Sequence, residues 1–599
     1  MVKTVFDMVL KNAAPRRVFA ALMILGCATA ASAQTIRVSP ANEELEARIE
    51  AEALVLQAAP DATRAEVLAS ADGDYSRLLA VLYEEGYFGP SISITVAGQE
   101  VSTITPLNVP TTLSPVVISV TLGPEYSFGQ AEIAPRAPGS EPPEGFVPGA
   151  TAGTAIIGTA ANGALADWRR ASHAKAEITG QQITARHSDN QIDVAIAIEP
   201  GPPLTFGRLT VEDHPDFRRE RILQIIGFPS GDDYSPKAVR DARNRLVDTG
   251  AFSSVVLEEA EEISPGQTLD FTLGYEPAPK RRIGFGGEID TTEGLSLQAF
   301  WLHRNIFRGA ESLRFDASVD GIGGPGGGID YTLGTTLRIP GFRRADDTLE
   351  FTVGIQRENF ENVVEDLAGA IVRRSRQVND DLEVGVFGGL RFSEATDDDG
   401  TTRFKHIILG IDGELDLRDD PLNSRGGTYS FVEIQPFIGV DDSESGIRIT
   451  GDFRAYQSVG DAFVLALRGQ LGSVIGPEID ETPPDFLFLS GGGGTVRGQG
   501  FESLGVGTGD DLTGGLGFAG LSLELRRDIS DTISVVGFAD YGYVSQDSEL
   551  SNGEGHAGAG VGVRYNTPFG PFRVDVGVPV GDSSDGTEFG LYIGLGQSF

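Results

Sequence analysis

From Arg282 to the C-terminus the sequence is a series of short segments in which apolar and polar residues alternate, such as Leu295–Trp301 and Leu349–Ile355. We count roughly sixteen such segments, separated by stretches rich in Gly, Asp, Asn and Pro. An even number of alternating segments is typical of a bacterial outer-membrane β-barrel. An open sheet cannot cross lipid, because the backbone groups of its edge strands would lack hydrogen-bond partners. The pattern therefore predicts a membrane barrel, with a large soluble β-sandwich or lectin array as the alternative.

The N-terminus has the features of an export signal. Its basic region contains Lys11, Arg16 and Arg17. An apolar segment follows at Val18–Ala30, and the small residues after it predict cleavage before Gln34. Residues 1–33 would then be a signal peptide, and its removal would take away Cys27, the only cysteine of the chain. The alternative is a lipoprotein signal, with lipidation of Cys27.

The composition argues against several classes of function. The formal net charge is -39 at pH 7, whereas a nucleic-acid-binding protein needs clustered cations to contact phosphates. The six histidines are scattered without the spacing of a metal site. The glycine-rich stretches do not lie between a strand and a helix, as a phosphate-binding loop does. We therefore expect no nucleic-acid partner, no metal, no cofactor and no enzymatic activity.

The residues before Arg282 follow a different pattern, in which helical and strand segments alternate. Two units recur there. Gly123–Ile133 and Gly201–Val211 share a Gly-Pro pair, a Phe-Gly pair and an alternating strand. Leu78–Ile94 and Ala242–Glu258 share a helical pattern, a glycine, an aromatic residue and a strand. A period of about 80 residues predicts three small α/β modules in series; the alternative is three unrelated α/β insertions.

This order of elements resembles that of POTRA domains, which are small periplasmic modules with a β-α-α-β-β order. The third module carries the whole helix-loop-helix-strand series, at Phe217–Glu258. The resemblance places POTRA modules at residues 34–122, 123–200 and 201–277, and the barrel at residues 280–599. The expected fold class is α+β periplasmic POTRA repeats followed by an all-β, 16-stranded transmembrane β-barrel.

A glycine-rich stretch at Gly491–Gly505 contains a single cation, Arg497. Val496, Arg497 and Gly498 resemble a motif of the family that joins POTRA repeats to a sixteen-stranded barrel. In that family the motif lies at the tip of an extracellular loop that folds into the lumen. The family usually has an aromatic residue next, whereas this chain has Gln499. The alternative is an exposed loop arginine with no partner.

The same resemblance implies a partner acid for this arginine. In the family the arginine pairs with an aspartate on an inward-facing strand, in a Phe-x-Asp-x-Gly pattern. Phe538, Asp540 and Gly542 resemble this pattern, so Asp540 is the expected partner of Arg497. The physical argument agrees, because a buried guanidinium is costly and a carboxylate that binds it with two hydrogen bonds offsets the cost.

The last alternating segment is expected to form one side of a weak barrel seam. Gly590, Gly594 and Gly596 give it little side-chain packing and a high backbone entropy cost. The chain ends in an aromatic residue, Phe599, and such endings resemble the recognition signal of outer-membrane barrel proteins. A weak seam could open sideways and template a client strand.

The chain most resembles the Tam-type outer-membrane assembly factors. The resemblance implies an outer-membrane protein with periplasmic POTRA domains and with unfolded outer-membrane proteins, including autotransporters, as clients. It also implies contact with outer-membrane lipid and an inner-membrane-anchored, TamB-like partner. The POTRA modules would accept client or partner strands by β-augmentation. The alternatives are a two-partner-secretion transporter, whose plug helix the segment Ala41–Ala59 could mimic, a BamA-type general insertase and a passive channel.

Overall fold

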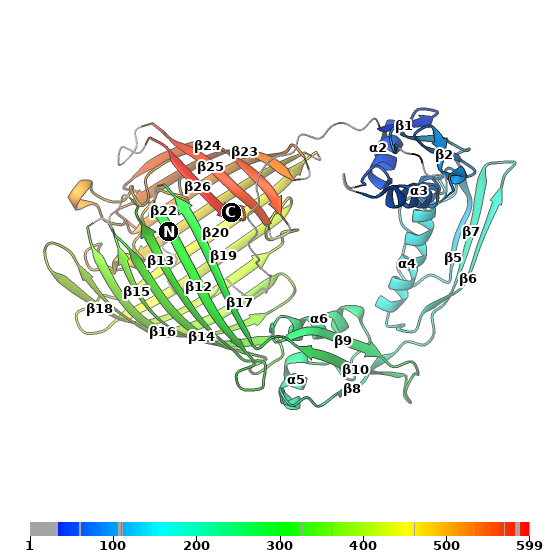
Figure 1. Cartoon of the computed structure of the whole chain (residues 1–599). Helices are drawn as coiled ribbons and strands as arrows, with labels where there is room; N and C mark the ends of the chain where they lie inside the picture. Colours follow the sequence, from blue (N-terminus) through cyan, green and yellow to red (C-terminus); the bar gives the residue numbers. More distant parts are fainter. Residues whose placement is uncertain are drawn as a thin grey trace.

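The chain forms three small sheets, each with helices, followed by a closed barrel (Figure 1). The computed structural model describes residues 34–58, 62–105, 110, 112–291, 293–324, 328–360, 362–460, 462–530, 532–567, 570–581, 588–597 and 599. The predicted signal peptide, residues 1–33, lies outside the described residues. None of the helices in these ranges combines the length and the hydropathy that a membrane span needs.

The first small sheet has the strand order β1-β4-β2-β3 and a core that it shares with two helices. Leu45 and Ile49 of helix α2 are buried in this core. The segment that could mimic a plug helix is therefore part of the first sheet's own core. The elements are β1 (Gln34–Ser39), α2 (Glu43–Glu52), α3 (Arg64–Glu84), β2 (Ser91–Val96), β3 (Gln99–Glu100), the 3-10 helix η1 (Val101–Thr103) and β4 (Val116–Thr121).

The second sheet, β5-β7-β6, and the third sheet, β8-β10-β9, repeat one topology. In each, the first strand pairs in parallel with the last, and the middle strand pairs antiparallel with the last. The first sheet follows the same rule through β1, β2 and β4. Among the described residues the second unit has one helix where the others have two. The elements are β5 (Ser127–Ala134), α4 (Thr154–Arg170), β6 (Glu177–Arg186), β7 (Gln191–Glu199), β8 (Thr205–Val211), α5 (Arg219–Ile226), α6 (Pro236–Val247), β9 (Phe252–Glu259) and β10 (Thr268–Pro277).

Strands β11 to β26 form a closed barrel of 16 strands, so the predicted fold class is confirmed. Along these strands large apolar residues face outward, and charged residues are buried on the inner side. The strands are β11 (Arg281–Asp290), β12 (Gly294–Arg304), β13 (Ser312–Ile322), β14 (Asp330–Pro340), β15 (Asp347–Asn359), β16 (Val364–Gln377), β17 (Leu382–Thr396), β18 (Thr401–Asp416), β19 (Gly427–Gly439), β20 (Gly446–Val459), β21 (Phe463–Ile475), β22 (Gly517–Asp528), β23 (Ile533–Ser545), β24 (Gly553–Thr567), β25 (Gly570–Val580) and β26 (Gly590–Leu595).

The third small unit contacts the strand-connecting turns at the end of the barrel that faces it (Figure 1). Arg221 of α5 donates to the carbonyl oxygen of Pro340 at 2.6 Å, and Arg245 of α6 donates to Asp346 at 2.5 Å. Lys237 of α6 reaches Asp380 at 2.9 Å. The carboxylates of Asp380 and Asp241 raise the pKa of Lys237. These contacts place the unit against the turns β14–β15 and β16–β17.

Candidate functional site: a loop latch beside the barrel seam

The long connection between β21 and β22, residues 476–516, folds back into the barrel lumen. Its residues Phe486, Phe488 and Leu504 are buried in one cluster with inward-facing wall residues such as Phe437 and Val544. This cluster holds the body of the loop against the inner wall of the barrel. The tip of the loop reaches strands β22, β23 and β25. We call residues 476–516 the lumen loop.

The structure places Arg497, at the tip of the lumen loop, against Asp540 of β23. Arg497 Nε donates to one carboxylate oxygen at 2.8 Å and Nη2 donates to the other at 3.0 Å. The backbone N–H of Arg497 also donates to Asp540, at 3.1 Å. Both side chains are almost fully buried, with 3% and 1% of their surface exposed. The pair has the two-pronged geometry that makes arginine–carboxylate contacts strong.

Asp540 is one of three acids around the arginine. Arg497 Nη1 lies 2.7 Å from Glu524 of β22 and 3.4 Å from Asp575 of β25. Two wall arginines compensate these extra acids: Arg564 contacts Asp575 at 3.1 Å, and Arg526 contacts Glu524 at 2.9 Å. The cluster therefore balances three guanidinium groups against three carboxylates, as buried charges require. We call these six residues the latch.

The other residues of the two predicted motifs also lie at the contact between Arg497 and Asp540. The guanidinium lies over the ring of Phe538, 3.6 Å from its centroid, and Val496 is fully buried. Gly498 has φ +98, and a Cβ there would lie 2.6 Å from the backbone of Val578. A side chain at Gly542 would come within 2.2 Å of the Ser490 hydroxyl. The two glycines thus allow the loop backbone and the wall to touch.

Gln499, which stands where the family usually has an aromatic residue, makes a polar contact in place of a ring contact. Its side chain is fully buried, and Nε2 donates to the carbonyl oxygen of Ala557 on β24 at 2.8 Å. The amide thus ties the loop tip to β24, a fourth strand of the same wall besides β22, β23 and β25. A benzene ring at this position could not make that hydrogen bond.

The barrel closes between β11 and β26 through a very short pairing. Among the described residues, the register pairs are Ile289 with Ile593 and Asp290 with Tyr592. Thr291 adds two hydrogen bonds to Leu591, of 3.2 and 2.9 Å. By contrast, β11 pairs with β12 along its whole length. We call the β11–β26 junction the seam.

The seam glycines serve more than one purpose. Gly594 lies under the ion pair of Arg573 with Glu288, which measures 3.0 Å, and a Cβ there would be 3.0 Å from Arg573 Nε. Gly590 packs against Tyr592, whose hydroxyl would be 2.3 Å from a Cβ at that glycine. Gly596 follows β26 with φ +98, a conformation that favours glycine.

The C-terminal residue, Phe599, lies in the lumen and is not part of the last strand. β26 ends at Leu595, and Phe599 is buried with Tyr456 and Ala466. Arg526 of the latch donates to the Phe599 main-chain oxygen at 3.2 Å. The predicted last strand therefore ends one residue earlier than Gly596, because the backbone turns inward there.

Sequence reasoning missed the residue that joins the latch to the seam. Tyr592 of β26 is 2% exposed, and its hydroxyl accepts a hydrogen bond from the backbone N–H of Gly498 at 2.8 Å. The last strand is thus attached directly to the tip of the lumen loop. A tyrosine at an inward position of the final segment was the only signal, and nothing local distinguished it from other lumen residues.

A second ionic contact holds the base of the lumen loop on the opposite wall. Arg391 of β17 lies 2.5 Å from Glu365 of β16 and also contacts Asp485 of the loop. Here the wall supplies the arginine and the loop supplies the acid, the reverse of the latch. Within the described ranges, no group of three or more His, Cys, Asp or Glu residues is placed to hold a metal ion.

Comparison with known proteins identifies the family. A model of the Omp85 superfamily domain matches residues 294–599, which is half of the chain. The chain belongs to the Omp85 superfamily. The predicted resemblance to BamA/TamA-type proteins is therefore confirmed at the level of the superfamily, and with its closed barrel this Omp85 protein is an outer-membrane protein.

Individual relatives are distant. The outer membrane protein assembly factor BamA of Neorickettsia risticii (strain Illinois) is 23% identical over 412 residues, 62% of this chain and 52% of the relative. The chain thus spans about half the length of that relative. The crystal structure of BamA from Haemophilus ducreyi lacking POTRA domains 1-3 has a TM-score of 0.58 at 14% identity, and covers 74% of this chain and 93% of its own; it is similar in fold. CdiB from Acinetobacter baumannii has a TM-score of 0.49 at 12% identity, covering 79% and 90%.

Proposed function

We propose that this Omp85 protein is an assembly and translocation factor for outer-membrane proteins, of the Tam type, that works by parting its seam. The observation that carries the proposal is the seam itself. Among the described residues, β11 and β26 share two register pairs, whereas β11 is paired with β12 along its whole length. Each strand pair in a barrel contributes hydrogen bonds that lipid cannot replace. The junction with the fewest such bonds costs the least to open, and an opened β11 offers a free edge to a client strand.

The outward side of β11 suits this role. Phe285 is 79% exposed and Ile283 is 62% exposed on the outer surface of the barrel. These apolar residues face the lipid beside the seam. A client strand added at this edge would have its apolar residues in the same layer of the bilayer.

The latch would set how easily the seam parts. Tyr592 links the last strand to Gly498, and Arg497 links the same loop tip to β22, β23 and β25. The loop therefore braces the wall next to the seam from inside. We propose that Val496, Arg497 and Gly498, with Phe538, Asp540 and Gly542, keep this wall rigid while the seam opens.

The three small units are proposed to be POTRA modules, at residues 34–122, 123–200 and 201–277. Strand β6 is an edge strand of the second sheet, and all of its residues are exposed. Such an edge can accept a strand of an unfolded client or of an inner-membrane-anchored, TamB-like protein. The proposal assigns no enzymatic step, and client folding or the partner would supply the energy.

Two alternatives fit less well. A two-partner-secretion transporter would use a plug helix, and α2 is packed in the first unit through Leu45 and Ile49. A passive channel needs a permanently closed seam and a clear lumen, whereas the lumen loop and Phe599 occupy part of this lumen. A BamA-type general insertase shares the proposed chemistry and would differ in its clients.

The test is a disulfide across the seam. Ile289 and Ile593 are register partners, and antiparallel partners have Cα separations of about 4.5–5.5 Å, which suits a disulfide. The variant Ile289→Cys/Ile593→Cys, oxidised, should stay folded and inserted but lose assembly of an autotransporter client in cells or in proteoliposomes. Reduction should restore the activity.

The control is a disulfide on the wall away from the seam. Leu390 of β17 and Ile407 of β18 are register partners, and both face outward. Leu390→Cys/Ile407→Cys should form a disulfide without loss of activity. Full activity of the quantitatively oxidised seam variant would contradict lateral opening, and equal loss in both variants would point to a general effect of crosslinking.

A further inference from the structure

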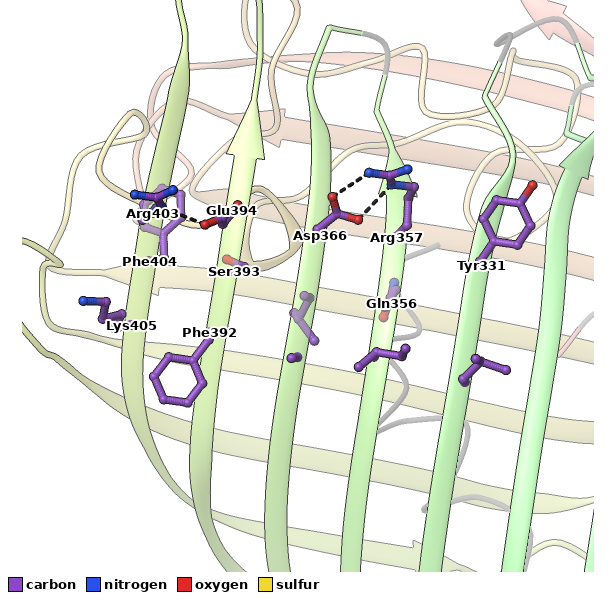
Figure 2. A pocket seen from close by; sticks show the side chains of 14 residues that line it. Tyr331, Gln356, Arg357, Asp366, Phe392, Ser393, Glu394, Arg403, Phe404 and Lys405 are labelled. Atoms are coloured by element: carbon purple, nitrogen blue, oxygen red, sulfur yellow. Dashed lines mark hydrogen bonds and ion pairs between the residues drawn. The ribbon is translucent and has the colours of Figure 1, made fainter.

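The outer wall of the barrel carries a groove for which the proposed assembly function has no use. It lies over strands β14 to β18 (Figure 2), and its volume is about 650 Å³. Ligand pockets typically enclose about 300–1,000 Å³. The groove is near the strand ends that point away from the three small units, because the turns that contact the third unit are at the other ends of these strands.

The floor of the groove is formed on β16 by a small outward residue, Ala368, and a second small residue, Ala370, continues the same outward face beyond it. Ala368 and Ala370 are both exposed, and each lies between large apolar residues on the two neighbouring strands. These flanking residues are Ile355 and Val353 on β15 and Phe392 and Leu390 on β17. About half of the surface of each flanking side chain is exposed. Two alanines between four large side chains leave a trough along β16 that an extended hydrocarbon chain fits.

The trough has a defined length. The groove itself reaches Ala368 on β16, and the outward face of this strand continues to Val372, which is about 20 Å from Asp366 at a rise of about 3.3 Å per residue. Below Asp366, the outward residues of this stretch are Ala368, Ala370 and Val372, which are all apolar. Asp366 is therefore the upper boundary of an apolar stretch along β16.

A row of one tyrosine and four charged residues closes the upper end of the trough. In register order the row consists of Tyr331, Arg357, Asp366, Glu394 and Arg403, from β14 to β18. Arg357 donates two hydrogen bonds to Asp366, of 2.8 and 2.6 Å. Arg403 donates to Glu394 at 2.6 Å. Figure 2 shows both ion pairs side by side above the apolar side chains.

The order of charges in this row selects the kind of headgroup. Two carboxylates are direct cross-strand neighbours, and like charges in such a position repel. Asp366 pairs with Arg357 of β15, and Glu394 pairs with Arg403 of β18. Both arginines are exposed, and exposed ion pairs contribute little free energy. A cationic group above Asp366 and Glu394 would relieve the repulsion, and a phosphate beside it would reach Arg357 or Arg403. The third cation that lines the groove, Lys405 of β18, is already paired with Asp441, so a purely anionic headgroup would meet the two carboxylates first.

We propose that this groove binds one membrane lipid with a phosphoethanolamine headgroup. The acyl chain lies along Ala368 and Ala370, the ammonium group lies at Asp366 and Glu394, and the phosphate lies at a flanking arginine. Tyr331 at the end of the row marks the interface, where the amphipathic ring of tyrosine is favoured.

A second column of small residues on the barrel provides the matched control. On β24, Ala557 and Ala559 lie in line on the outer side. The residue at the head of this column is Gly555, and its register partner on β23 is Tyr543. This column therefore lacks the ordered charges that the proposed headgroup would need.

The experiment uses the full-length mature chain in nanodiscs of equimolar phosphatidylethanolamine, phosphatidylglycerol and phosphatidylcholine. Native mass spectrometry after mild release counts the lipids that stay bound. The wild type should retain a single phosphatidylethanolamine with at least about tenfold preference, or about 1.4 kcal/mol. Ala368→Phe, which fills the groove, should lower this retention about tenfold, and Ala559→Phe on β24 should leave it unchanged.

A charge variant tests the headgroup separately and does not alter packing. Asp366→Asn/Glu394→Gln leaves Arg357 and Arg403 without their acids, so retention should move to phosphatidylglycerol. Equal retention of the three lipids by the wild type would mean that the retained molecules are ordinary surrounding lipid, and this result would overturn the proposal. So would a wild-type preference for either other lipid, or unchanged retention in a folded Ala368→Phe variant.

Discussion

The two walls of this barrel are held in different ways. On the wall away from the seam, every residue of β17 has a register partner on β18, and the strands are 15 and 16 residues long. At the seam, β26 has 6 residues and two of them are in register with β11. The wall next to the seam instead carries the latch, in which three acids and three arginines are buried together.

This difference explains why an ionic cluster lies where it does. A backbone ladder needs no side-chain support, because each added pair brings its own hydrogen bonds. Where the ladder is short, side chains from a separate loop can join the strands instead. Tyr592 and Arg497 connect four of the last five strands to one loop tip. The wall can then stay intact although the seam is weak.

The largest expected effect comes from removing the centre of the latch. Arg497→Ala leaves Asp540, Glu524 and Asp575 buried with one cation fewer. Breaking a buried pair in this way typically costs about 3–5 kcal/mol. We expect a corresponding loss of stability in urea unfolding of the reconstituted barrel, followed by the shift between folded and unfolded bands on a gel.

A double-mutant cycle shows whether the effect belongs to the pair. Arg497→Ala and Asp540→Ala should be strongly non-additive, because each removes the same contact. Additive losses would mean that the two residues act independently, and the latch as described would be wrong.

A smaller effect is expected from the hydrogen bond between Gly498 and Tyr592, which joins the tip of the lumen loop to the seam. Tyr592→Phe keeps the ring but leaves the backbone N–H of Gly498 without its acceptor, which typically costs about 1–3 kcal/mol. The same unfolding assay measures the change. The matched control is Tyr456→Phe, because the Tyr456 hydroxyl is buried and has no hydrogen-bond partner among the described residues. A loss at Tyr456 as large as that at Tyr592 would contradict a specific role for the Gly498 contact.

The smallest effect is expected on the outer face of the opposite wall. Arg403 and Glu394 form an ion pair at 2.6 Å, but their side chains are 69% and 53% exposed. Exposed pairs contribute about 0–1 kcal/mol, so Arg403→Gln should leave the unfolding midpoint almost unchanged. A loss comparable to that of Arg497→Ala would show that distance rather than burial sets the strength of these pairs.

The sequence predicted the parts of the molecule that carry a repeated or specific local pattern. Period-two alternation predicted the barrel, and the Val-Arg-Gly and Phe-x-Asp-x-Gly motifs pointed to Arg497 and Asp540, which lie in contact. Glu524 and Asp575 were missed because a polar residue at every second position is ordinary on a lumen-facing strand. Their approach to Arg497 depends on how far the lumen loop reaches across strands, and that distance is not encoded locally. The inward turn of the chain after Leu595 was missed for the same reason.

Hydrogen–deuterium exchange of the reconstituted barrel tests the central claim most directly. Peptides from β11 and β26 should exchange faster than peptides from β17 and β18 in the wild type. Arg497→Ala should accelerate exchange in β22 to β26 and leave β17 and β18 protected, whereas Arg391→Ala should affect the base of the lumen loop without changing the seam. Uniform protection around the wild-type barrel, or equal acceleration of both walls by Arg497→Ala, would contradict the account of a weak seam braced by the latch.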